Sequence, residues 1–158
     1  LSISHDRIGD VLLAQGDGVG ALAAYRKSLT VRETLAARDL ANTQWQRDLS
    51  VSHEKIGDVL VSQGDGAGAL AAFRKGLTIA ETLAARDPAH TQWQTDVAVS
   101  CSKLGKSTEL PLAERRVMLA RGLKILHDLR QAGRLLPSQD WTGWFEAELK
   151  KLDDGAKD

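Results

Sequence analysis

Residues 49–96 read LSVSHEKIGDVLVSQGDGAGALAAFRKGLTIAETLAARDPAHTQWQTD, and they repeat residues 1–48 without a gap, with 35 of 48 positions identical. Most substitutions between the two copies are conservative, such as Ile3 to Val51 and Tyr25 to Phe73. A third copy begins with VAVSCSKLGKS at residues 97–107 and then diverges. A fixed period of this kind indicates stacked units, each of which buries its apolar face against its neighbours.

Each copy predicts two helices joined by a short turn. In the second copy, five residues of the first helix recur at helical spacing and fall on one, mostly apolar face: Trp45, Leu49, His53, Ile56 and Leu60. We expect Thr43 to cap this helix and Asp65, in the Gly-rich turn, to cap the next one. The second helix should end near Arg86, because Pro88 disfavours helical dihedral angles in the residue before it.

Small residues recur where two helices should come close together. Gly9, Gly57 and Gly105 hold the same position in the first helix of each copy, although glycine inside a helix costs about 1 kcal/mol relative to alanine. We therefore expect backbone contact with a neighbouring helix at this position, with Tyr25, Phe73 and Leu119 as the large partners.

This pattern resembles the tetratricopeptide repeat family, in its long bacterial form. The matching residues are Ile8-Gly9, Leu12, Gly16, Ala21, Tyr25 and Ser28, then Ile56-Gly57, Leu60, Gly64, Ala69, Phe73 and Gly76, and in the third copy Leu104-Gly105, Leu119 and Gly122. The resemblance covers about residues 1–131 and implies an all-α fold, a right-handed α-solenoid (αα-superhelix) of about three antiparallel helix pairs. The period is about 48 rather than the usual 34, which predicts that both helices are about two turns longer.

The chain is predicted to form one solenoid domain, with repeats at 1–48, 49–96 and 97–133. A capping helix at 138–153 should cover the last repeat, since solenoids need an atypical terminal element. Its apolar stripe holds Trp141, Trp144, Phe145 and Leu149. The two tryptophans either seal the last repeat, the reading that we favour, or dock on a partner. The later copies are preceded by a Thr-Gln-Trp-Gln segment that the first copy lacks, so we expect a fragment of a longer protein.

Two features suggest catalysis, and both have a structural explanation that we favour. His5 and His53 recur beside carboxylates, but they lie on the apolar stripe, where Cys101 follows in the third copy. Equivalent groups on stacked helices lie roughly 10 Å apart, too far for a nucleophile and its base. The Gly-rich segments at 16–20 and 64–68 lack the preceding strand and the Lys-Ser/Thr of a phosphate loop. We therefore predict no enzyme, no metal and no cofactor.

The composition excludes several other classes. The formal net charge is zero, which gives no general attraction to nucleic acid or to an anionic membrane. Residues 97–134 carry eight Lys and Arg against three Asp and Glu, but aromatic residues are not interleaved with them, as nucleic-acid binding would favour. No apolar run approaches the roughly 20 residues of a membrane span. The single cysteine is typical of a reducing compartment, so we expect a cytoplasmic protein.

The family resemblance implies that the first helix of each pair lines a concave groove. The groove positions are Ile3, Asp6, Asp10, Leu13, Val51, Glu54, Asp58, Val61, Val99, Ser102 and Lys106. This groove would be acidic with apolar patches at one end and basic at the other. We expect binding specificity to lie where the copies differ, as at Arg32 and Ala80.

The predicted function is a non-catalytic protein-interaction scaffold whose groove binds a protein or peptide, such as a basic or amphipathic segment. A self-associating solenoid module is one alternative. Another is a sensor or arm domain of a larger bacterial effector or signalling protein.

Overall fold

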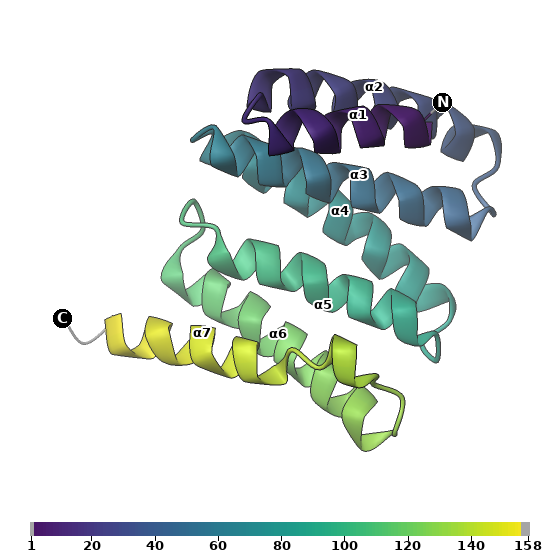
Figure 1. Cartoon of the computed structure of the whole chain (residues 1–158). Coiled ribbons are helices and arrows are strands. Elements are labelled where there is room, and N and C mark those ends of the chain that lie inside the picture. Colours follow the sequence, from purple (N-terminus) through teal and green to yellow (C-terminus); the bar gives the residue numbers. More distant parts are fainter. Residues whose placement is uncertain (1, 156–158) are drawn as a thin grey trace. The chain divides into compact units, whose positions relative to one another are not determined.

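The computed structural model describes residues 2–155, and these residues form helices and no strand (Figure 1). In chain order the elements are α1 (Ser2–Ala14), α2 (Gly18–Arg38), α3 (Thr43–Ser62), α4 (Gly66–Arg86), α5 (Thr91–Lys106), α6 (Leu112–Gln131), a short 3-10 helix η1 (Pro137–Gln139) and α7 (Thr142–Gly155). The all-α prediction is confirmed. The lengths of α3 and α4, 20 and 21 residues, agree with the long helices that the 48-residue period predicts.

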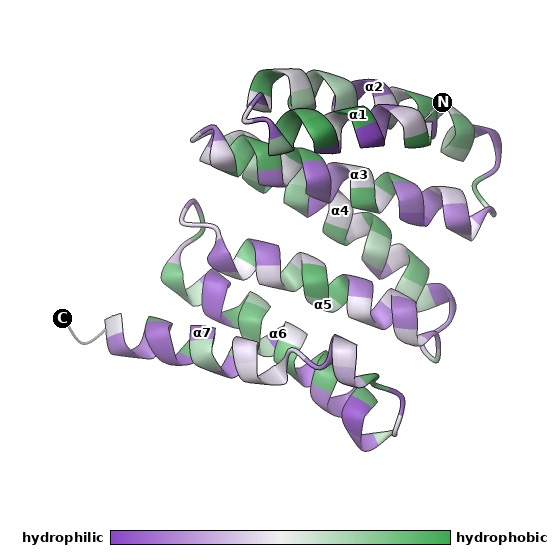
Figure 2. Ribbon diagram, viewed as in Figure 1, coloured by the Kyte–Doolittle hydropathy of each residue, from purple (hydrophilic) through white to green (hydrophobic). Residues whose placement is uncertain are grey.

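The chain divides into two compact units whose boundary falls inside α4, after Ile79. The first unit holds α1, α2, α3 and most of α4, and the second holds the end of α4 together with α5, α6, η1 and α7. Figure 2 shows apolar and polar residues alternating along the helices, as expected for helices that bury one face.

In the first unit, α1 packs beside α2, and α3 packs on α2 (Figure 1). The close contact within each helix pair is made by a glycine and an aromatic ring. A Cβ atom added to Gly9 would lie 2.6 Å from Cε1 of Tyr25, and one added to Gly57 would lie 2.4 Å from Cε1 of Phe73. Both predicted partners are confirmed, and only glycine fits at these two positions.

Of the two helix caps that the sequence predicts, the one at Asp65 is found and the one at Thr43 is not. Asp17 and Asp65 accept hydrogen bonds from the N–H groups of Gly20 and Gly68, as predicted for Asp65. The cap of α3, however, is Asn42, whose side-chain oxygen accepts from the Trp45 N–H at 3.1 Å. The expectation that Thr43 caps α3 was wrong, because Thr43 is already the first helical residue.

In the second unit, α5 packs on α6 and α6 on α7. A Cβ atom added to Gly105 would lie 2.5 Å from the Leu119 side chain, which fixes the register of the divergent third pair. The same contact occurs once more, because a Cβ atom on Gly122 would lie 2.4 Å from Cε1 of Phe145. Leu119 and Phe145 belong to one core cluster with Ala98 and Leu126.

The last helix differs from the prediction in its start and in the residue that seals the core. The predicted capping helix began at residue 138, but residues 137–139 form the 3-10 helix and α7 begins at Thr142. Pro137 can start a helical turn but offers no N–H, and Asp140 then accepts from the Thr142 N–H at 3.3 Å. Phe145 is 1% exposed and fills the contact with α6, whereas Trp141 and Trp144 are 38% and 37% exposed. Phe145 is therefore the residue that fills the core position, and both tryptophans keep more than a third of their surface exposed.

We predict that Gly57→Ala lowers the free energy of unfolding by about 1–2 kcal/mol, measured by urea denaturation. The added methyl group must displace the Phe73 ring, and overpacking of this kind costs about 1–3 kcal/mol, against a gain of up to about 1 kcal/mol in helix propensity.

The matched control is Gly143→Ala in α7, where an added Cβ atom meets nothing within 4 Å. This variant should be neutral or slightly more stable. If Gly57→Ala stabilised the chain as Gly143→Ala does, the close contact with Phe73 would not be required.

Candidate functional site

An open, mostly apolar hollow lies between α5 and α7 in the second unit. It is lined by Val99 and Ser102 of α5 and by Trp141, Trp144 and Phe145 at the start of α7, and its volume is about 270 Å³. Val99 and Ser102 are two of the groove positions that the sequence predicts. The structure therefore brings part of that set together with the two tryptophans for which the sequence left packing and docking open.

The lining residues Val99 and Ser102 share one face of α5 with Lys106, because the three recur at intervals of three and four residues. The Ser102 hydroxyl donates to the Val99 carbonyl oxygen at 2.7 Å, so its donor is used within the helix. The Lys106 Nζ atom lies 6.0 Å from the centroid of the Trp144 ring, a cation–π distance. The hollow thus has apolar walls with one cation at its margin.

Phe145 and Trp144 hold the opposite wall. The Phe145 ring is buried against Gly122, and the Trp144 ring meets it edge to face with centroids 5.0 Å apart and an interplanar angle of 85°. Edge-to-face aromatic pairs are favourable by about 0.5–1.5 kcal/mol beyond their burial. This contact orients a tryptophan that still exposes more than a third of its surface.

Hydrogen bonds connect the start of α7 to α6. Nε of Arg130 donates to Asp140 Oδ2 at 3.0 Å, and Nη2 of the same guanidinium donates to the Thr142 hydroxyl. The Thr142 hydroxyl in turn donates to Asp140 Oδ1 at 2.7 Å. Hydrogen bonds first from Arg130 and then from Thr142 lower the pKa of Asp140. These contacts set the direction in which the turn before α7 presents Trp141.

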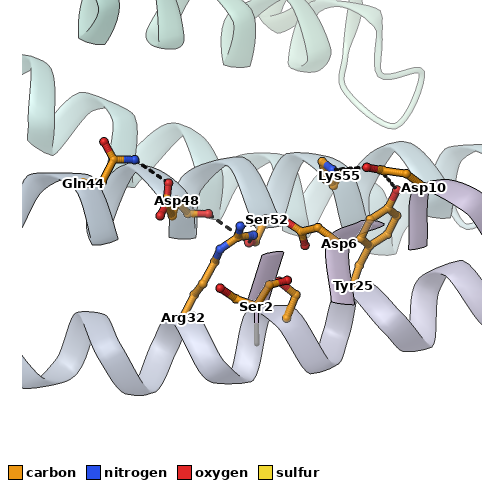
Figure 3. A network of polar contacts seen from close by, with 10 residues as sticks. Ser2, Asp6, Asp10, Tyr25, Arg32, Gln44, Asp48, Ser52 and Lys55 are labelled. Carbon is orange, nitrogen blue, oxygen red and sulfur yellow. Dashed lines mark hydrogen bonds and ion pairs between the residues drawn. The ribbon is translucent and has the colours of Figure 1, made fainter. Parts of the chain in front are cut away.

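The acidic groove positions of the first repeat are already paired within the chain (Figure 3). Asp6 forms an ion pair with Arg32 at 2.7 Å. Asp10 accepts from the Tyr25 hydroxyl at 2.5 Å and from Lys55 at 2.9 Å. The hydrogen bond from Tyr25, followed by that from Lys55, lowers the pKa of Asp10. Burial, followed by the hydrogen bond to Asp10, raises the pKa of Tyr25.

Arg32 is a packing residue rather than a determinant of specificity. It is 8% exposed, and besides Asp6 on α1 it donates to the hydroxyl of Ser52 on α3. The difference between Arg32 and Ala80 in the second copy therefore changes how the helices of the first unit are joined. The sequence predicted specificity at this difference, but the Arg32 side chain is buried and bound to Asp6 and Ser52.

The other groove positions of the first unit differ in how far they are exposed. Ile3, Leu13 and Val61 are exposed apolar residues, Val51 and Glu54 are half-buried, and Asp58 is exposed.

Two of the residues that suggested catalysis, His53 and Cys101, are enclosed by packing, whereas His5 is half-buried. His53 is buried, and its pKa is lowered chiefly by that burial and then by Lys75. Cys101 is fully buried, and burial raises its pKa to about 11, which keeps the thiol protonated. Within residues 2–155 we find no group of three His, Cys, Asp or Glu side chains able to hold a metal ion.

Comparison with known proteins leaves the family open, since no protein-family model matches the chain and no curated protein is significantly similar to it. In the described part of the chain, no helix has both the length and the apolar character needed to cross a membrane.

We predict that Tyr25→Phe, which copies Phe73 of the second repeat, lowers the free energy of unfolding at pH 7 by about 0.5–1 kcal/mol through loss of one hydrogen bond. Because the pKa of Asp10 is lowered from its ordinary value of 3.8, its contribution is present above pH 3.8 and is lost as the pH falls through the lowered value.

Urea denaturation of both proteins at pH 7 and near pH 2 tests this expectation. The difference between wild type and Tyr25→Phe should shrink at the lower pH, and Asp10→Ala, which deletes the acceptor, should remove most of it at pH 7. A difference that stays the same at both pH values would contradict the assigned role of Asp10.

Proposed function

We propose that the chain is a non-catalytic protein-interaction module, and that the hollow between α5 and α7 binds a large apolar side chain of a partner segment. The observation that carries the proposal is the pair of partly exposed tryptophans, Trp141 and Trp144, on an apolar hollow beside Lys106. Tryptophan is enriched among the residues that dominate the binding energy of protein interfaces.

The size of the hollow favours a side chain over a cofactor. Its volume of about 270 Å³ lies just below the range of roughly 300–1,000 Å³ that is usual for small-molecule pockets. The walls also offer few polar groups, since the Ser102 hydroxyl is used by Val99. A leucine, phenylalanine or tryptophan side chain would gain from burial there without needing a hydrogen-bond partner.

The charges near the hollow favour a partner segment that carries a carboxylate beside its apolar side chain. Lys103 and Lys106 both lie in the last turn of α5, and Lys106 is exposed. Two of the four groove acids that would attract a basic segment, Asp6 and Asp10, are paired with Arg32, Tyr25 and Lys55. We therefore propose an amphipathic partner with an acidic residue, in place of the basic segment considered first.

The scaffold itself is proposed to be a tetratricopeptide-type, right-handed solenoid. Two features support this assignment: the near-identical helix pairs of the first two repeats, and the glycine in the first helix of each pair that faces a bulky residue of the second. The enclosed positions of His53 and Cys101 support a role without catalysis.

A library of random peptides displayed on phage tests the proposal. Peptides selected on the purified chain should share a large apolar residue with a nearby Asp or Glu, and their synthetic forms should bind with a measurable Kd by fluorescence anisotropy. Trp144→Ala should weaken binding about 30-fold or more, because truncating a central interface tryptophan costs about 2 kcal/mol or more.

Val117→Ala is the matched control, since Val117 is an exposed apolar residue of the same unit that does not line the hollow. It should leave the affinity unchanged. Equal affinity of wild type and Trp144→Ala for the selected peptides would contradict the proposal.

A further inference from the structure

Identical residues have opposite burial in the first two repeats. Ile8 and Ile56 occupy the same position of α1 and α3, yet Ile8 is 52% exposed and Ile56 only 6%. Val11 and Val59 are also equivalent, with 55% and 1% exposed. Sequence cannot explain this difference, so it must come from what packs on each helix.

The covering element on α3 is α2, the second helix of the preceding repeat. Ser52, Ile56, Val59 and Gln63 recur at intervals of four, three and four residues and form one stripe along α3. Helix α2 contacts both ends of this stripe: Arg32 donates to the Ser52 hydroxyl, and a Cβ atom added to Gly18 would lie 3.2 Å from Nε2 of Gln63. Ile56 and Val59 lie between these two contacts.

The same stripe on α1 is uncovered. Its members are Ser4, Ile8, Val11 and Gln15, all of them exposed, and they match the α3 stripe residue for residue. Helix α2 of the same repeat does not use them, because it packs on the Gly9 side of α1 through Tyr25.

We propose that this α1 stripe is a docking face for another helix pair of the chain's own repeat type. The second helix of that pair would lie on α1 as α2 lies on α3. Helix α2 indicates which residues the docking helix needs. It needs a small residue at the position of Gly18, which would lie opposite Gln15. It also needs an arginine at the position of Arg32, which would donate to the Ser4 hydroxyl.

The proposal is independent of the proposed function, because the α1 stripe is in the first unit and the α5–α7 hollow is in the second. It can be tested by fusing an additional copy of residues 1–48 in front of Leu1. The new junction, Asp48 followed by Leu1, reproduces the natural junction of Asp48 and Leu49. Hydrogen exchange of α1 amides, followed by mass spectrometry, is compared between the fusion and the original chain.

The fusion should slow exchange of the original α1 amides about tenfold or more. The double variant Ile8→Glu/Val11→Glu, made in the original copy, should abolish this protection. It should also lower the Tm of the fusion by about 5 °C or more, because docking would bury two carboxylates. The same two substitutions should change the Tm of the unextended chain by less than about 2 °C.

Leu13→Glu is the matched control, because Leu13 and its equivalent Val61 are both exposed, so a preceding repeat leaves this position uncovered. It should preserve the protection of α1 in the fusion. Unchanged exchange of α1 in the fusion would overturn the proposal. So would concentration-dependent dimerisation of the unextended chain that Ile8→Glu abolishes, since the stripe would then serve pairing between copies of α1.

Discussion

The structure depends on a close approach between paired helices, in which a glycine backbone on one helix meets a bulky side chain of the other. It occurs at Gly9 with Tyr25, at Gly57 with Phe73, at Gly105 with Leu119 and at Gly122 with Phe145. Because an added methyl group would overlap the partner in each case, the contact fixes both the separation and the register of the two helices. The divergent third pair keeps this contact although its turn, residues 107–111, is longer than the turns at 15–17 and 63–65, and although its helices differ in sequence.

Contacts between successive pairs then decide what remains available for binding. In the first unit, α2 buries the Ile56 stripe of α3 and joins α1 to α3 through Arg32, while Tyr25 and Lys55 hold Asp10. In the second unit, Phe145 takes the core position on α6 and leaves Trp144 beside it on the hollow. Asp6 and Asp10, which seemed suited to a partner, are thus paired within the first unit, whereas the hollow of the second unit is apolar.

Much of the fold could be predicted from the sequence, since repetition and helical spacing identify the helices, the turns and the glycine contacts. The cap at Asn42 and the start of α7 at Thr142 could not, because several polar residues compete at each helix start and the geometry of the turn selects one.

The candidate site was predicted only in part. Val99, Ser102 and Lys106 were among the expected groove residues, but their association with Trp141 and Trp144 depends on how α7 packs. The repeated glycine pattern did hold a signal for Phe145, because Gly122 needs a bulky partner as Gly57 does. Pairing of Asp6 with Arg32 was hidden, since burial of an arginine depends on the neighbouring helices and not on its own spacing.

The central claim is that stacking of neighbouring helix pairs, rather than local sequence, determines which equivalent residues form the core. The most direct measurement is the free energy of unfolding of Ile8→Ala and of Ile56→Ala, two identical changes at equivalent positions. We expect Ile56→Ala to cost about 2–4 kcal/mol, as for a buried isoleucine, and Ile8→Ala to cost less than about 1 kcal/mol, because Ile8 is half exposed. Equal costs for the two substitutions would contradict this account.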